Sequence, residues 1–159
     1  MNLFYLHHDP VEAARMQCDR HVVKMILETA QMLSTAHNEL DGIQVAYKST
    51  HKNHPSTVWV RSSAAAYEWA FTHMMALGRE YTKRYGKVHK TIAEHAKSLS
   101  QLPVNLEHCM VPFDVPPQCM YDECRGPDTV RAYLNYYNVK ADEWAAKGRP
   151  MTWYGRTTE

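Results

Sequence analysis

The sequence predicts an all-α protein that folds as a single compact domain of about five helices. Apolar residues recur at helical spacing over long stretches, whereas no stretch of useful length alternates apolar and polar residues as a half-buried strand does. Proline or glycine stands where several of these stretches begin or end. With 159 residues, 45% of them hydrophobic, the chain suits one core and resembles neither a disordered chain nor a membrane protein.

The first elements follow from their end signals. Residues 1–8 are apolar and aromatic at their start, and we expect them to form an N-terminal arm that lies extended against the core. Asp9 followed by Pro10 is typical of a helix N-cap with proline at the first helical position. This helix continues or kinks near residues 18–19, and a second helical stretch then runs to Gly42, which provides a C-terminal stop.

A long central helix is predicted over residues 56–85, after a polar loop at 44–55. No proline interrupts its periodicity, and Gly86 ends it. A further helix covers residues 90–102 and is stopped by a proline. The central helix has these side chains available for burial: Val58, Trp59, Ala65, Trp69, Met75, Leu77 and Tyr81.

Residues 103–127 contain five prolines, so this segment is predicted to be an irregular loop. Together with His108, three of the four cysteines (Cys109, Cys119 and Cys124) lie in it, which raises the possibility of a zinc site. Their spacing lacks the Cys-x-x-Cys pair that structural zinc sites usually contain, and we expect no metal. Disulfides are not expected in a chain that we assign to the cytoplasm.

The last helix is predicted over residues 129–146, with Asp128 as its N-cap. The tail, residues 148–159, is aromatic and basic, and we expect it to pack back on the body. The buried face of the helix is expected to consist of Val130, Tyr133, Leu134, Tyr137 and Trp144.

Charge and composition restrict the location and the partners. The formal net charge is +1, so binding of nucleic acid must come from a local patch. Basic residues alternate with aromatic ones at 47–54 and 83–90, although solvated loops or a helix C-terminus explain both equally well. No segment is apolar for long enough to span a membrane, and the start lacks the basic region of a signal peptide. We expect a cytoplasmic monomer.

The second helical stretch carries a polar stripe on one face. Its opposite face is apolar, and a solvated surface helix is one interpretation. Such helices usually repeat Glu/Lys pairs. This stripe instead holds a proton-transfer group, a cation, a carboxylate and an amide once each, a combination typical of a catalytic or binding site. The stripe consists of His21, Lys24, Glu28, Gln31, Thr35 and Asn38.

His21 and Glu28 lie two turns apart, about 10 Å along the axis, and can therefore flank one substrate without touching. A carboxylate here can hold a histidine tautomer, stabilise a developing cation or act as a general base. Lys24 is spaced to pair with Glu28, and a purely structural ion pair is the alternative interpretation for it.

At these residues the chain resembles the pyrimidine-dimer DNA glycosylases of the endonuclease V type from T-even phages. Four features carry the resemblance: Asn2-Leu3 near the N-terminus, His21 and Glu28 as a His-x6-Glu pair, Lys83-Arg84-Tyr85-Gly86 at the end of the central helix, and Arg149-Pro150-Met151-Thr152-Trp153-Tyr154 in the tail. The helix around Glu28 is also similar to one in a set of phage proteins, which implies a phage origin and the cytoplasm of an infected bacterium.

The resemblance implies an enzyme that flips a nucleotide out of the DNA stack. In that family the N-terminal α-amine attacks the sugar C1′, forms a Schiff base and supports β-elimination, while the helix glutamate assists; an α-amine keeps a sizeable free-base fraction near neutral pH. The bulky Asn2 predicts that Met1 is retained. The expected catalytic residues are therefore Glu28, His21 and Met1, without a cofactor. The expected substrate-binding residues are Asn2, Lys24, Gln31, Lys52, His54, Arg61, Arg149, Trp153 and Tyr154.

Two departures from the family leave other hypotheses open. The family's N-terminal threonine is absent, and Leu27 and Gln31 occupy positions where the family has arginines that grip phosphates. An enzyme that modifies a pyrimidine, for instance by transfer to a hydroxymethylated base in DNA or in a nucleotide, is the second hypothesis. The third is a non-catalytic helical protein that binds nucleic acid or a host protein.

Overall fold

The computed structural model describes residues 1–152, which contain six α-helices, two short 3₁₀ turns and no strand. The all-α prediction is confirmed. None of these helices is long and apolar enough to cross a membrane. The elements are α1 (Pro10–Met16), α2 (Asp19–Asp41), α3 (Pro55–Val60), α4 (Ala64–Tyr85), α5 (Lys90–Leu99), η1 (Val104–Leu106), η2 (Asp122–Cys124) and α6 (Thr129–Ala146).

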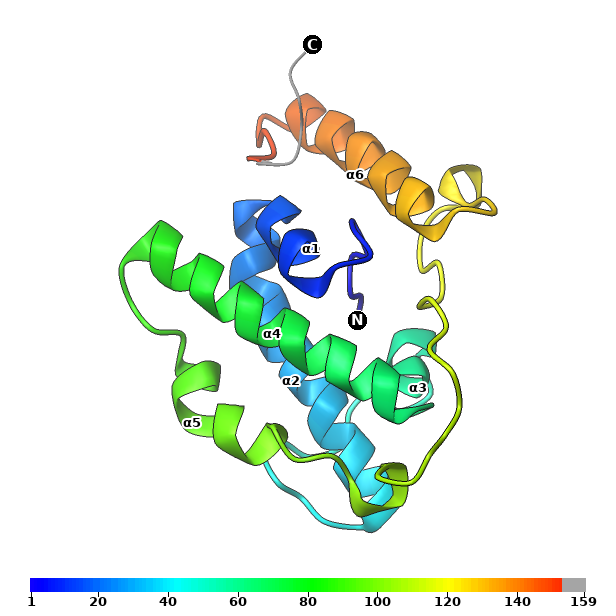
Figure 1. The fold of residues 1–159 in the computed structure, drawn as a ribbon. Helices are drawn as coiled ribbons and strands as arrows, with labels where there is room; N and C mark the ends of the chain where they lie inside the picture. The colour runs from blue at the N-terminus through cyan, green and yellow to red at the C-terminus, as the bar shows by residue number, and fades with distance from the viewer. Residues whose placement is uncertain (153–159) are drawn as a thin grey trace.

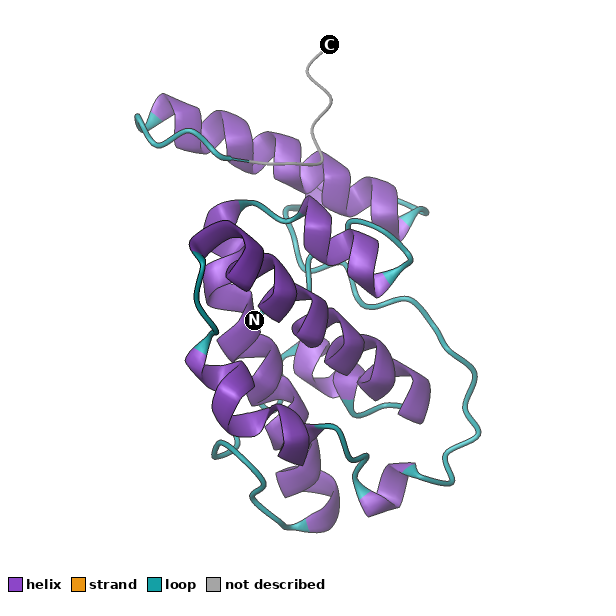
Figure 2. Cartoon of the chain, turned by 60° about the vertical axis from the view of Figure 1, so that its left-hand side comes forward, coloured by secondary structure: helices purple, strands orange, loops and turns teal. Residues whose placement is uncertain are grey.

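The body of the molecule is built on α2 and α4, which cross each other in its middle (Figure 1). Helix α1 packs on α4, while α3 and α5 pack on α2. Helix α6 lies along one end of this body, and the long irregular connection that leads to it runs along the side (Figure 2). The N-terminal arm enters between the body and α6, so the first residues lie inside the fold.

The core follows from the helical periodicity of the sequence. Val22, Ile26 and Leu33 of α2 are fully buried against Met74 and Leu77 of α4. The N-terminal arm joins this core with a run of fully or nearly fully buried side chains: Leu3, Phe4, Tyr5 and Leu6. This burial fixes the start of the chain relative to α2.

The central helix of residues 56–85 is not continuous, which corrects the sequence-based prediction. Helix α3 ends at Val60, and α4 begins at Ala64 after a break with extended backbone at Ser63. The Ser63 hydroxyl accepts a hydrogen bond from the Ala66 N–H at 3.0 Å, and the Ser62 hydroxyl bonds to the Trp59 carbonyl. Serine side chains thus compete with the helical backbone bonds and cap a new helix.

The break also changes which side chains are buried. Val58, which was expected in the core, is 43% exposed, because α3 turns this face outward. Ala65, Met75 and Tyr81 are half-buried, and the remaining candidates of the central helix, Trp59, Trp69 and Leu77, are buried.

Several predicted helix ends are confirmed. Gly42 and Gly86 end α2 and α4 with φ angles of 68° and 71°, the left-handed conformation that glycine adopts without strain. Helix α6 has the predicted bounds, with Tyr133 and Tyr137 buried and the other three predicted side chains half-buried. Helix α5 ends at Leu99, three residues earlier than predicted.

A buried histidine joins α4 to the junction between α1 and α2. His73 is fully buried; its Nδ1 lies 2.9 Å from the Pro10 carbonyl and its Nε2 lies 2.9 Å from the Gln17 amide nitrogen. A carbonyl only accepts, so Nδ1 carries the proton and Nε2 accepts from Gln17. Burial lowers the pKa of His73 from 6.5 to about 4, and the ring is neutral at neutral pH.

We expect the free energy of unfolding to decrease as the pH falls below 6.5. The unfolded chain protonates this histidine near pH 6.5 and the folded chain only near pH 4, so protons bind the unfolded state first, at a cost on the order of 2–3 kcal/mol by pH 4. His21, whose pKa is also lowered, adds to the same trend. Urea unfolding at pH 7 and pH 4.5 measures the loss.

His73→Gln removes the titrating group and is expected to make this pH dependence shallower. The surface substitution His108→Gln is the matched control. An identical slope in the wild type and in His73→Gln would show that His73 is not the source.

Candidate active site

The N-terminal arm makes a tight turn that is held by Asn2. The Asn2 Oδ1 accepts a hydrogen bond from the Phe4 N–H at 2.9 Å, and its Nδ2 donates to the Cys119 carbonyl at 2.9 Å. Phe4 has a φ of 50°, a strained conformation for a bulky residue, and its ring stacks on His21 with the centroids 4.0 Å apart. Asn2 therefore positions the arm, and its side chain is occupied by these contacts.

This turn places the α-amine of Met1 beside Glu28. The Met1 nitrogen lies 3.3 Å from Glu28 Oε1, and the Lys24 Nζ lies 3.7 Å from Oε2. The Glu28 side chain is only 16% exposed, whereas that of Lys24 is 68% exposed, so the lysine pair is a weak surface contact. Within residues 1–152 Oε2 has no hydrogen-bond partner, and the atom itself is buried.

The amine and the carboxylate open into a cleft of about 350 Å³. The N-terminal arm, α2, the loop before α3, the irregular segment and α6 all contribute side chains to its lining. The lining residues are Met1, Asn2, Phe4, His21, Lys24, Met25, Glu28, His54, Cys119, Tyr136 and Lys140.

His21 is a buried residue of the cleft lining and acts as a neutral hydrogen-bonding group. Its Nδ1 lies 2.6 Å from the Tyr137 hydroxyl, which in turn accepts from the Cys18 N–H at 3.3 Å. Burial lowers the pKa of His21 to about 3, and the charges of Lys140, Lys24 and Arg20 add to this shift. Burial also raises the pKa of Tyr137, so its hydroxyl keeps its proton. His21 holds the Phe4 ring and is poorly suited to act as an acid.

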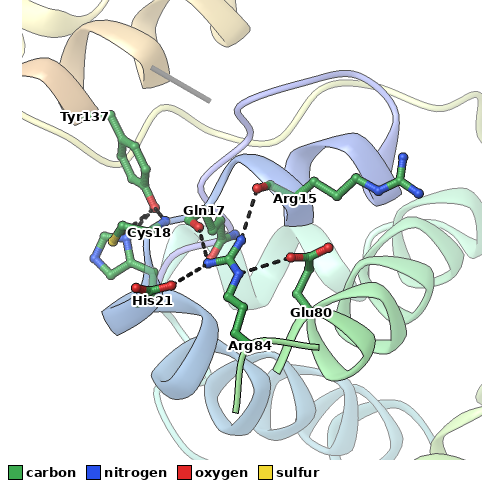
Figure 3. A network of polar contacts seen from close by, with 8 residues as sticks. Arg15, Gln17, Cys18, His21, Glu80, Arg84 and Tyr137 are labelled. Carbon is green, nitrogen blue, oxygen red and sulfur yellow. Dashed lines mark hydrogen bonds and ion pairs between the residues drawn. The ribbon is translucent and has the colours of Figure 1, made fainter. Parts of the chain in front are cut away.

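A buried arginine fixes the junction that carries Cys18 and His21 (Figure 3). Arg84, near the end of α4, donates to Asp19 and Glu80 and to the backbone carbonyls of Arg15 and Gln17, at distances of 2.8–3.1 Å. Its side chain is only 9% exposed. The basic cluster at 83–90 was a candidate DNA patch, but Arg84 belongs to this internal network.

The two ends of the polar stripe of α2 contact different parts of the structure. His21, Lys24 and Glu28 line the cleft, as the stripe predicts. Further along, Thr35 accepts from the Thr50 N–H at 3.2 Å, and Asn38 donates to the Tyr47 carbonyl at 2.9 Å. The second half of the stripe thus anchors the loop at residues 43–54.

The anchored loop brings His54 to the cleft from a distant part of the sequence. His54 is half-buried and is the N-cap of α3, because its Nδ1 accepts from the Ser56 N–H at 3.1 Å. His54 was expected to bind substrate, and its place in the cleft is compatible with that prediction.

Other predicted binding residues lie away from the cleft. Gln31 does not line it, and Lys52 is exposed on the loop surface. Arg61 donates to the Lys52 carbonyl at 2.7 Å. Arg149 lines a separate cavity of about 190 Å³ beside Trp144. Trp153 and Tyr154 lie outside the described residues.

Five residues of the cleft were missed by sequence reasoning: Phe4, Met25, Cys119, Tyr136 and Lys140. The Lys140 Nζ lies 4.8 Å from the centre of the Tyr136 ring, and burial lowers its pKa. The spacing of four between residues 136, 140 and 144 was the available signal, since it puts a lysine among the aromatic side chains on one face of α6. Nothing in the sequence indicated Phe4 or Cys119.

The cysteines are free thiols and are not grouped as metal ligands. Cys18 and Cys124 are buried, whereas Cys109 and Cys119 are partly exposed. In the described part of the chain no three His, Cys, Asp or Glu side chains come together as a metal-binding group.

A comparison with known protein families matches the part of the chain that contains the amine and carboxylate pair. The family described as pyrimidine dimer DNA glycosylase matches residues 1–94, more than half of the chain. The chain belongs to this family. The match includes Met1, Glu28 and His54, and it ends before the irregular segment and α6. No curated protein and no solved structure matches the chain significantly.

We expect Tyr137→Phe to lower the free energy of unfolding by about 1–3 kcal/mol. The substitution leaves the buried Cys18 N–H and the His21 Nδ1 without their hydrogen-bond partner. Urea unfolding at neutral pH measures the change. Tyr121→Phe removes a hydroxyl from an exposed tyrosine and is the matched control. Equal stabilities of the two variants would contradict this role of Tyr137.

Proposed function

We propose that the protein is a DNA glycosylase with lyase activity that uses the Met1 amine as nucleophile and Glu28 as its acid and base. The observation that carries the proposal is the distance of 3.3 Å between the Met1 nitrogen and Glu28 Oε1 inside a cleft. Membership of a glycosylase family supports DNA containing a damaged pyrimidine as the substrate class.

The proposed chemistry conserves protons within this pair. The free amine bonds to the sugar C1′ as the C1′–N bond to the base breaks; the base leaves with that electron pair and takes a proton from solvent. Glu28 takes the proton that the new ammonium loses. The C1′–O4′ bond then breaks with its electron pair on O4′, and Glu28 returns the proton there. The product is an iminium between Met1 and C1′, whose positive charge the adjacent carboxylate stabilises.

The remaining cleft residues suit a nucleotide substrate. Lys24 and Lys140 place positive charge in the lining of the cleft, which suits a phosphate of the DNA backbone. Tyr136 adds an aromatic side chain to the lining, and aromatic side chains are common contacts of nucleotide bases. We assign His21 and Asn2 to positioning, because the contacts of their side chains hold the arm that carries the amine.

We expect the protein to form a covalent adduct with abasic duplex DNA when borohydride is present, because borohydride reduces the iminium. Glu28→Gln should slow adduct formation about 100-fold or more, since the acid and base is lost. Glu39→Gln, on an exposed position of the same helix, is the matched control. Gel electrophoresis of the trapped complex gives the rates. If the wild type forms no adduct, or if Glu28→Gln forms it at the wild-type rate, the mechanism is wrong.

We expect the adduct to map to Met1. Mass spectrometry of the intact protein verifies that Met1 is the first residue, and peptide mapping of the reduced adduct identifies the modified amine. A Gly-Ser extension before Met1 should abolish trapping, because the amine moves away from Glu28. An adduct on Lys24 or Lys140 would overturn the assignment of the nucleophile.

A further inference from the structure

His54 occupies the cleft with one of its ring nitrogens already engaged. Its Nδ1 accepts a hydrogen bond from the Ser56 N–H and thereby caps α3. A nitrogen that accepts from an N–H carries no proton itself, so the proton of the neutral ring is on Nε2. Within residues 1–152 no protein group bonds to Nε2. The backbone thus holds the ring in the tautomer that offers an N–H donor.

The charges around His54 keep the ring neutral. Burial lowers its pKa, the Met1 ammonium and His51 lower it further, and Glu28 opposes them. A neutral imidazole is a weak acid, but its N–H is a good donor to an oxygen that gains negative charge. A preformed donor in the same cleft as the nucleophile is suited to that task.

We propose that the Nε2–H of His54 donates a hydrogen bond to the sugar ring oxygen O4′ of the target nucleotide. This inference rests on the proposed function, because O4′ is bonded to the carbon that the Met1 amine attacks. O4′ receives the electron pair when the C1′–O4′ bond breaks, and a donor there stabilises the developing charge. His54 transfers no proton, since the proton that ends on O4′ comes from Glu28.

The substitution His54→Asn separates this role from helix capping. Asparagine is among the best N-cap residues, so the variant keeps the cap of α3 but loses the reach of the imidazole Nε2–H. His51→Asn is the matched control, because His51 lies on the same loop with a φ of 46°, a conformation that asparagine tolerates. Circular dichroism and the urea midpoint check that both variants fold.

The test compares two duplexes that differ at one atom. One contains a tetrahydrofuran abasic analogue, and the other contains the cyclopentane analogue, in which CH₂ replaces O4′. We expect the wild type and His51→Asn to bind the tetrahydrofuran duplex about three- to tenfold more tightly, the contribution of one hydrogen bond. His54→Asn should bind the two duplexes equally, which a purely structural effect on the fold would not produce.

The outcomes distinguish this inference from the proposed function. If the wild type forms the borohydride adduct and His54→Asn keeps the wild-type preference for tetrahydrofuran, His54 does not contact O4′ although the lyase mechanism stands. A wild type that binds both duplexes equally overturns the inference in the same way. If the wild type forms no adduct with abasic DNA, the proposed function fails, and the inference falls with it.

Discussion

The contact between the Met1 amine and Glu28 requires that the first residue of the chain lie inside the fold. An N-terminus normally remains in solvent, where its charge is hydrated. Here Leu3 and Tyr5 are buried in the core, and Phe4 adopts a strained backbone conformation so that the chain turns back toward α2. The hydrogen bonds of Asn2 and the stacking of Phe4 on His21 offset that strain.

Buried hydrogen bonds also hold the residues that surround the arm. Phe4 stacks on the His21 ring. His21 in turn is hydrogen-bonded to the Tyr137 hydroxyl and lies close to the junction between α1 and α2. Arg84 ties that junction to α4 through two carboxylates and two carbonyls (Figure 3). A buried guanidinium with its donors satisfied in several directions fixes geometry more effectively than a surface ion pair does.

Three histidines in or near the site are kept neutral and are hydrogen-bonded. Burial keeps His21, His54 and His73 neutral, and each spends one or both ring nitrogens on a defined hydrogen bond. In the proposed mechanism the amine and the carboxylate exchange the protons, while His21 and His73 hold the arm and the helix junction in place. Lone histidines in a sequence are usually taken as acid–base candidates, and in this fold burial removes that capacity.

Most features that depend on residues close together in the sequence could be predicted, whereas features that depend on contacts between distant residues could not. Helix types, the glycine stops and the convergence of His21, Lys24 and Glu28 depend on spacing along one helix, and spacing is visible in a sequence. The break at Ser63 came from a local side-chain cap that the apolar periodicity concealed. Phe4 and Cys119 reach the cleft only through tertiary contacts, and no local pattern specifies such contacts.

Helix α6 contributes side chains to the lining of the cleft and lies beyond residues 1–94, which match the family. The amine and carboxylate pair and the α6 side chains of the cleft are therefore encoded in separate portions of the polypeptide, joined by a connection rich in proline. A substitution in α6 can therefore alter the shape and charge of the cleft while leaving the stretch that carries Met1 and Glu28 unchanged.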